Sequence, residues 1–418
     1  MDLLLTRLLR FLARCRLLLQ VRLQGFRRVP IPLRRRLHAE QNSFNRWVQD
    51  HYAGASWSTL VLHEPVVQPF LDLLNRPAGG EAYCGGVVFY NPNVQPTLRH
   101  FRGRRAIDRP LTSIASEGQI PLRLERRQFW CGPLAFHFGH QIADFGSRLL
   151  LASLDPRGGE LLWCPWRSGE HWEELQPWQQ FLLRYLNPGA KAHRICTTPV
   201  QVKALVVVPQ QARMRAAPTA AHLEGLCWCE RSLQPRSNEV VYVSRARFAA
   251  CTNAASLLGA YAAEALLEKF LEERGVRVIH PESISLQQQL EIYLGSRVLI
   301  LAEGSAQHGL ELLGVHPHKK VLLLCRRPQR EGMDLPLRAR FPNIQFVEAL
   351  KAQWRSADGE TWNGLALLDW SVVVKAINPW LSRPITDREC RALESASEDQ
   401  LRMLGAVVDL KSIFPLLT

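Results

Sequence analysis

The chain has 418 residues, of which 47% are hydrophobic and 22% are charged, and it contains ten cysteines. This composition is ordinary for a globular protein and excludes an intrinsically disordered chain, a collagen-like chain and a small disulfide-framework protein. The formal net charge is +14, but residues 1–38 alone hold ten arginines and a single acidic residue, Asp2. Because the rest of the chain is only mildly basic and shows no reader motif, no nucleic-acid partner is expected.

Residues 1–38 alternate Leu and Phe with Arg, and no apolar run in them reaches the roughly 18–20 residues that a membrane-spanning helix needs. The pattern predicts a basic amphipathic helix, which either lies on an anionic membrane surface or packs on its own domain with Arg facing water. A transit peptide is a third interpretation, although the segment lacks serine. The scattered cysteines favour a reducing cytoplasm, with attachment to the inner face of a membrane as the alternative to a free protein.

From residue 39 to 215, short apolar runs are separated by Pro and Gly. Residues 87–90 and 204–208 predict strands, and residues 141–151 predict a helix. Residues 216–235 are expected to be a linker between two domains.

The second half of the chain alternates apolar runs of strand length with helical patterns. Ser285 and Gln288 match a capping box at the start of one of these helices. Such alternation with continuous apolar strands predicts a parallel sheet covered on both faces, a Rossmann-like domain over residues 236–350. Residues 351–418 are expected to be a helical segment that packs across the two domains. The predicted strands are 240–243, 276–279, 298–301 and 321–324, and the predicted helices are 257–270, 286–294 and 306–313.

Ligands of open parallel sheets bind beyond the carboxyl ends of the strands, and two such ends carry suggestive residues. Ser244 and Arg245 follow the first strand, and Arg can bind a phosphate with two parallel hydrogen bonds. Gly304, Ser305 and Ala306 follow the strand at 298–301 and lead into a helix, so their N–H groups would form an anion site. The segment matches neither a dinucleotide fingerprint nor a P-loop.

In the first half, His140 and Asp144 are four residues apart on the predicted helix and therefore share a face. An acid that orients a histidine suits a general base that removes a proton from a hydroxyl, although a surface His–Asp pair has the same pattern. The sequence contains no DxD triplet and no HExxH motif, so no metal ligand set and no cofactor is expected.

Taken together, these motifs resemble glycosyltransferase family 61, a family of GT-B-type, inverting enzymes, and the chain looks like a divergent, bacterial-like member. The family has a GHxxxD element in its first half, then a strand ending in Ser-Arg, an Asn-Glu pair, a PExxSxxxQ stretch and a strand that runs into a His-Gly loop. The matching residues in this chain follow the same order: Gly139-His140…Asp144, Val243-Ser244-Arg245, Glu264, residues 281–289 and residues 298–306.

The resemblance implies an α/β, GT-B-like fold with two Rossmann-like domains facing a cleft: an acceptor-side domain at 39–215 and a nucleotide-sugar-binding domain at 236–350. It also implies transfer of a sugar from a nucleotide-sugar donor, often UDP-linked, to a hydroxyl of a glycan, lipid-linked glycan or glycoprotein. On this chain, His140 would be the base and Asp144 would orient it. The donor would be bound by Ser244, Arg245, Glu264 and the N–H groups of Gly304, Ser305 and Ala306.

Two positions depart from the family pattern. Glu303 stands where the family usually has His, which places a negative charge beside the expected anion site, and Ala263 replaces the family's Asn. Glu303 could bind sugar hydroxyls, or could itself be the base in place of His140. The alternative function is a catalytically degenerate family member that acts as a nucleotide- or glycan-binding scaffold.

Overall fold

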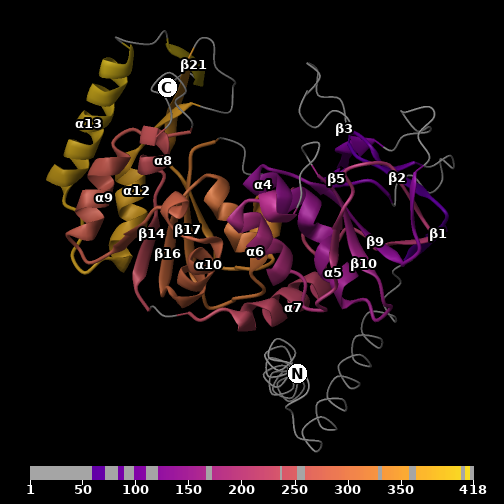
Figure 1. Cartoon of the computed structure of the whole chain (residues 1–418). Helices are drawn as coiled ribbons and strands as arrows, with labels where there is room; N and C mark the ends of the chain where they lie inside the picture. Colours follow the sequence, from indigo (N-terminus) through magenta and orange to yellow (C-terminus); the bar gives the residue numbers. More distant parts are fainter. Residues whose placement is uncertain are drawn as a thin grey trace, which may run out of the picture. The chain divides into compact units, whose positions relative to one another are not determined.

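The computed structural model describes residues 59–70, 83–88, 98–109, 121–165, 172–235, 238–251, 259–327, 332–356, 364–405 and 410–414. The predicted amphipathic helix at 1–38 lies outside the described residues, as do residues 89–90 of one predicted strand. The chain is a mixed α/β protein that divides into two compact units, Met1–Leu233 (unit 1) and Gln234–Thr418 (unit 2) (Figure 1). Among the described helices, none combines the length and the apolar character needed to cross a membrane.

Unit 1 contains a five-stranded sheet in which β13, β9, β10 and β11 run parallel and β1 is antiparallel to β13. Every residue of β9 and of β10 is buried, as expected for strands that are covered on both faces. The strands in spatial order are β1 (Leu60–His63), β13 (Ala204–Val207), β9 (Gln128–Leu134), β10 (Glu160–Pro165) and β11 (His193–Ile195).

A smaller mixed sheet of unit 1 has the order β4 (Gly86–Val88), β2 (Val66–Gln68), β12 (Val200–Val202) and β8 (Leu122–Leu124). Strand β3 (Tyr83–Cys84) pairs with β7 (Asp108–Arg109). Strands β5 (Phe101–Arg102) and β6 (Arg105–Ala106) form a short hairpin, which contributes to the site described below.

The helix predicted over 141–151 is present, but its geometry changes along its length. It consists of α4 (Phe138–His140), a π-helical turn (Gln141–Phe145), a 3-10 turn (Gly146–Arg148) and α5 (Leu149–Leu154). The Gly146 N–H donates to the Gln141 carbonyl, and a Cβ at Gly146 would lie only 2.7 Å from that oxygen. Glycine therefore permits the wide turn, and π-turns of this kind are frequent at functional sites.

The segment 172–235 contains strands β11, β12 and β13 and several helical elements. It includes a 3-10 turn (Trp172–Glu174), α6 (Pro177–Tyr185), α7 (Ala220–Cys229) and a second 3-10 turn (Glu230–Ser232). Half of the segment 216–235, which was expected to be a linker, is helix α7, and the boundary between the two units falls within this segment, after Leu233. Thr219 caps this helix by accepting from the His222 N–H, and Leu223 and Leu226 are buried.

Unit 2 is built on a fully parallel five-stranded sheet, which confirms all four strands predicted there. The chain goes from β14 out to β15, then returns past β14 to β16, so the strand order reverses direction between β14 and β16. The fifth strand, β18, was not predicted. The spatial order is β15 (Arg277–Ile279), β14 (Val240–Val243), β16 (Val298–Ala302), β17 (Lys320–Cys325) and β18 (Gln345–Glu348).

Two of the three helices predicted in unit 2 lie at the predicted positions, whereas the helix predicted over 257–270 begins only at Glu264, because Ala263 before it has a left-handed backbone. Helix α10 (Leu286–Gly295) begins at the predicted capping box, in which the side chains of Ser285 and Gln288 both bond to the backbone. The short helix expected at 306–313 is a 3-10 helix, η7 (Ser305–Leu312). The remaining elements between the strands are α8 (Ala246–Cys251), α9 (Glu264–Glu272), a 3-10 turn (Pro281–Ser283) and α11 (Asp334–Arg338).

The expectation of a purely helical segment at 351–418 is wrong. Strands β20 (Leu365–Leu368), β19 (Leu350–Ser356) and β21 (Leu410–Phe414) form an antiparallel sheet in that order. Strand β19 mixes polar with apolar residues and therefore lacks a strand pattern, and it pairs with the nearby β20 and with the distant β21. The helices are α12 (Trp370–Ile377), a 3-10 turn (Asn378–Trp380) and α13 (Asp387–Gly405).

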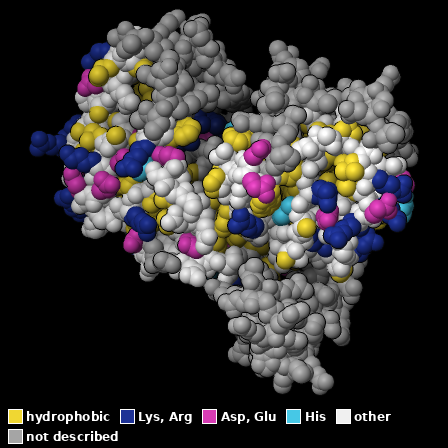
Figure 2. Space-filling view, viewed as in Figure 1, with side chains coloured by type: hydrophobic (Ala, Val, Ile, Leu, Met, Phe, Trp, Pro, Cys, Tyr) yellow, Lys and Arg dark blue, Asp and Glu magenta, His cyan; other side chains and the backbone are white. Residues whose placement is uncertain are grey.

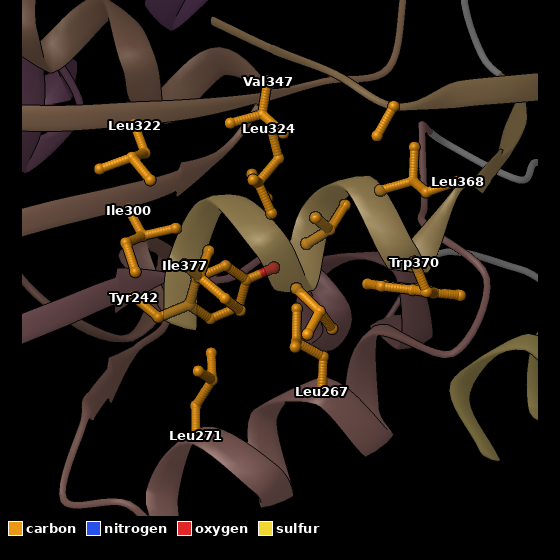
Figure 3. Close-up of a cluster of buried hydrophobic side chains, with 14 of the residues drawn as sticks. Tyr242, Leu267, Leu271, Ile300, Leu322, Leu324, Val347, Leu368, Trp370 and Ile377 are labelled. Atoms are coloured by element: carbon orange, nitrogen blue, oxygen red, sulfur yellow. The ribbon is translucent and has the colours of Figure 1, made fainter. Parts of the chain in front are cut away.

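Helices α9 and α12 cover one face of the parallel sheet and form the core of unit 2 with it. Figure 3 shows Ile377 of α12 close to Tyr242 and Ile300 of the sheet. Leu267 and Leu271 of α9 point toward the same cluster from below in this view. At the start of α12, the Trp370 indole N–H donates to the Ser397 hydroxyl of α13 over 2.7 Å. This core fixes the sheet whose carboxyl edge carries the site. On the face drawn in Figure 2, basic and acidic side chains are interspersed over the described parts of both units.

Replacing Ile377 by Ala should lower the free energy of unfolding by about 2–5 kcal/mol, because the side chain is fully buried and its loss leaves a cavity. Val372→Ala on the same helix is the matched control, since Val372 is 38% exposed and should change stability by no more than about 0.5 kcal/mol. Urea denaturation of the full chain measures both. Equal losses in the two variants would contradict the assignment of the inner face of α12.

Candidate functional site

The two loops that the sequence singled out in unit 2 lie side by side. Strands β14 and β16 pair directly, and Ser244-Arg245 and Glu303-Gly304 follow their carboxyl ends. The guanidinium of Arg245 lies against the backbone of Gly304, where a Cβ would come within 1.7 Å of an Arg245 terminal nitrogen. Gly304 is therefore required for this contact, rather than for an unusual backbone angle.

A second basic loop, Arg326-Arg327, follows β17 at the same edge of the sheet. The buried Arg326 donates from Nε to the Glu303 carbonyl over 3.0 Å, and its guanidinium lies where a Cβ of Gly259 would come within 2.6 Å of Cζ. Arg245 donates from Nε to the Gly259 carbonyl over 3.1 Å, so both arginines pack on one glycine.

Like charges gather at this edge. Burial lowers the pKa of Arg326 to about 10, and the charges of Arg327 and Arg245 act in the same direction, whereas Glu303 opposes them. Arg326 and Arg327 were not predicted as site residues, although the rule that identified Ser244 and Arg245 also applies to the first residues after β17. A cluster of guanidiniums that disfavour one another is a candidate anion site.

Glu303 is directed toward the arginine loop. Its Oε2 accepts from the backbone N–H groups of Arg326 (2.7 Å) and Arg327 (3.2 Å), and its Oε1 lies 3.5 Å from Arg327 Nε. Its own N–H lies 2.6 Å from the Tyr261 hydroxyl, which donates to the Leu324 carbonyl. The carboxylate thus joins the ends of β16 and β17 and offsets part of the local positive charge.

Glu264, the first residue of α9, bonds to the end of β14 as Glu303 bonds to the end of β17, by accepting from the backbone of the loop that follows the strand. Its Oε1 accepts from the Tyr242 hydroxyl (2.9 Å), the Ser244 hydroxyl (3.2 Å) and the Arg245 N–H (2.9 Å). Burial raises the pKa of Glu264 to about 7 in spite of these donors, and its Oε2 is buried without a hydrogen-bond partner among the described residues. Ala263, the departure from the family's Asn, is the N-cap with φ of 61°, and its N–H donates to Gln400.

The first residues of η7 complete the edge. Ser305 is exposed and Ala306 is half-buried. The Gln307 N–H donates to the Gly304 carbonyl over 3.2 Å, and the N–H groups of Ser305 and Ala306 precede this bond in the chain. Ser244, by contrast, is buried, and its hydroxyl is engaged by Glu264 and by the Ala246 N–H. The Ser244 hydroxyl therefore bonds within the protein and is buried beneath the edge.

In unit 1 the structure brings His140 and Asp144 together, with 3.0 Å between Nδ1 and Oδ2. Asp144 is fully buried, whereas the His140 side chain is 24% exposed. Burial alone would raise the pKa of Asp144, but hydrogen bonds from His140 and Arg102 hold it below its usual range. The pair therefore combines an ionised, buried carboxylate with an accessible imidazole.

Arg102 is the third member of this cluster and was missed by the sequence analysis. Its side chain is 29% exposed, and one terminal nitrogen lies 2.5 Å from Asp144 Oδ2 and 2.8 Å from His140 Nδ1. The segment Phe101-Arg102-Gly103-Arg104-Arg105 looks like any exposed basic loop, so no local pattern distinguishes Arg102. Gln210 ties the hairpin to the helix by bonding to Phe101 and to the Asp144 carbonyl.

A second His–Asp pair in unit 1 shows why accessibility matters. His100 Nδ1 lies 2.7 Å from Asp108 Oδ2, and Arg148 Nε lies 3.3 Å from His100 Nε2. All three residues are buried, and burial lowers the pKa of Arg148 to about 10. No substrate can reach this imidazole, so the network serves the fold. Among the described residues, no group of three or more His, Cys, Asp or Glu side chains could hold a metal ion.

In a comparison with protein families, the model described as Glycosyltransferase 61 matches residues 138–321. That range contains His140, Asp144, Arg245, Glu264 and Glu303, and leaves out Arg102 and Arg326-Arg327. No curated protein matches the chain. The family match supports a glycosyltransferase activity, which in general uses a sugar donor and a glycan acceptor.

Glu264 should make stability depend on pH. Because its pKa is raised from 4.5 to about 7, the native state holds a proton that the unfolded state releases, so the free energy of unfolding falls as pH rises through this interval. Relative to Glu264→Gln, whose amide oxygen can accept the same bonds, the native chain should lose on the order of 3 kcal/mol between pH 5 and pH 8. Parallel pH profiles of the two proteins in urea denaturation would contradict this assignment.

Proposed function

We propose that this protein is an inverting, metal-independent glycosyltransferase of GT-B architecture, in which unit 2 binds a nucleotide-sugar donor and unit 1 supplies the base. The observation that carries the proposal is the convergence of Arg245, Arg326 and Arg327 at the carboxyl edge of a parallel sheet, where the strand order reverses. Open parallel sheets bind their ligands at this place. The family match to residues 138–321 supports the same class of reaction.

The donor's diphosphate is the ligand that suits this edge. The charges of Arg327 and Arg245 disfavour the charged form of the buried Arg326, whereas an anion bound at this edge would favour it. The N–H groups of Ser305 and Ala306 would add donors to the diphosphate. We propose a UDP-linked sugar as the donor and a hydroxyl of a glycan, lipid-linked glycan or glycoprotein as the acceptor.

His140 is the proposed base. In a single displacement, the acceptor oxygen attacks the anomeric carbon as the bond from that carbon to the diphosphate oxygen breaks, and the electron pair leaves with the diphosphate. The acceptor's proton moves to His140, while the arginines of unit 2 stabilise the leaving charge, as electrostatic catalysis requires. Glu303 bonds to the backbone of Arg326 and Arg327, which favours a role in holding the arginine loop over a role as base.

A panel of sugar nucleotides tests this proposal. One nucleotide sugar should raise the thermal midpoint in a concentration-dependent manner, because a ligand that binds only the native state stabilises it. Arg245→Ala should abolish the shift, and Gly304→Ala should weaken it, since the added methyl group occupies the position of the Arg245 guanidinium. Transfer or donor hydrolysis should fall about 100-fold or more in His140→Ala, with the thermal shift retained.

Lys320→Ala is the matched control, because Lys320 is an exposed cation at the opposite, amino end of β17. It should bind donor like the native protein. A shift that survives in Arg245→Ala would place the donor elsewhere, and binding without any transfer or hydrolysis would contradict the catalytic proposal.

We also propose that residues 1–38 attach the protein to an anionic membrane surface on the cytoplasmic side, since they carry ten arginines among leucines. Full-length protein should float with vesicles that contain anionic phosphatidylserine and should lose this binding as salt rises. A chain that starts at residue 39 should remain unbound. Equal flotation of the two proteins would refute membrane attachment through this segment.

A further inference from the structure

We infer that Arg102 is a positioning residue for the proposed base: it holds the Asp144 carboxylate so that His140 carries its proton on Nδ1 and presents the Nε2 lone pair to the acceptor hydroxyl. The inference rests on the role proposed for His140. It goes further by naming the group, outside the family match, that determines which nitrogen of the imidazole can take a proton.

Arg102 spans both oxygens of the carboxylate. Its Nε lies 3.4 Å from Oδ1, and its terminal nitrogen lies 2.5 Å from Oδ2. A guanidinium that contacts both oxygens fixes the plane of the carboxylate as well as its position. Because Asp144 is fully buried, the donors that hold its ionised form are protein groups. Arg102 therefore restrains the orientation of Asp144 by a contact to each of its oxygens.

The contacts around His140 Nδ1 determine the tautomer. This nitrogen lies 3.0 Å from Oδ2 and 2.8 Å from the Arg102 terminal nitrogen. A guanidinium can only donate and an ionised carboxylate can only accept, so a lone pair on Nδ1 would face the anionic oxygen. With the proton on Nδ1, the Arg102 terminal nitrogen and His140 Nδ1 both donate to Asp144 Oδ2. These two nitrogens lie close together because they share that acceptor. Nε2 makes no hydrogen bond to any residue that the structure describes, and it is left as the base.

The hairpin that carries Arg102 is itself anchored. Gln210 accepts from the Phe101 N–H over 2.8 Å and donates to the carbonyls of Phe101 and Asp144, each over 3.1 Å. The backbone at Arg102 is thus tied to the same turn of the helix that carries Asp144. The guanidinium can be removed by substitution while this backbone anchor stays in place.

Two substitutions and one control test the inference in the full-length protein. Arg102→Ala should lower kcat for transfer about 10- to 100-fold, within the range that a positioned general base contributes. Donor affinity, measured by thermal shift, should stay within about twofold, because the proposed donor site is in unit 2. Arg102→Lys keeps the charge but lacks the two-point contact and should fall between Ala and the native protein. Arg104→Ala, an exposed position in the turn of the same hairpin, should leave kcat unchanged.

Added guanidinium ion supplies a rescue experiment. It should restore part of the activity of Arg102→Ala and none of the activity of Asp144→Asn, because only the first variant retains the carboxylate that the ion would bind. A kcat for Arg102→Ala equal to that of Arg104→Ala would overturn the inference while leaving the proposed function intact.

Nitrogen NMR of histidine-labelled protein gives a readout that needs no activity. The His140 signal, assigned by its loss in His140→Gln, should show a protonated Nδ1 in the native protein and in Arg104→Ala, and should move toward a mixture of tautomers in Arg102→Ala. Protonation at Nε2 in the native protein, or an unchanged signal in Arg102→Ala, would overturn the inference. A native protein that transfers no sugar would refute the proposed function alone, and the spectra would still decide the role of Arg102.

Discussion

The direct pairing of β14 with β16 is the constraint on which the candidate donor site depends. It places the loop that carries Arg245 against Gly304, although about 60 residues of chain separate them. Neither loop is an anion site by itself, because one holds a single arginine and the other a short 3-10 helix. Their contact at the reversal of strand order, together with Arg326 and Arg327 after β17, concentrates positive charge at one edge of the sheet.

Buried carboxylates then fix where that charge lies. Glu264 accepts from the backbone N–H of Arg245, and Glu303 accepts from those of Arg326 and Arg327. In both cases the acid bonds to the backbone of the arginine loop, and a glycine gives room to the guanidiniums of Arg245 and Arg326, whereas Glu303 also pairs with Arg327 Nε over 3.5 Å. Asp144 in unit 1 works differently, since it bonds to the side chains of Arg102 and His140. The acids of this protein thus organise its cations, which explains a glutamate at position 303 beside a basic cluster.

Ala263, the second position at which the sequence departs from the family pattern, also has a structural explanation. Ala263 caps α9 in a left-handed conformation, a backbone state that Asn tolerates better than Ala, and Gln400 of α13 satisfies its N–H. The position therefore concerns the start of the helix, and the carboxylate next to it, Glu264, makes the contacts to the arginine loop. The π-helical turn at 141–145 likewise has a local cause, because Gly146 removes the Cβ that would block it.

The sequence by itself determined four strands of the parallel sheet of unit 2, the start of α10 and the pairing of His140 with Asp144, because strand runs, a capping box and a spacing of four residues are local patterns. It also located Arg245 and Gly304 at strand ends. It could not determine the antiparallel strands at 350–414, where β19 has a mixed pattern and one of its two partners, β21, is distant in the chain, or the helical character of 220–229. Only the tertiary structure placed Arg102 on Asp144 and directed Glu303 toward Arg326. These contacts join segments that are 42 and 23 residues apart, and packing between elements, which no local period encodes, decides which side chains meet.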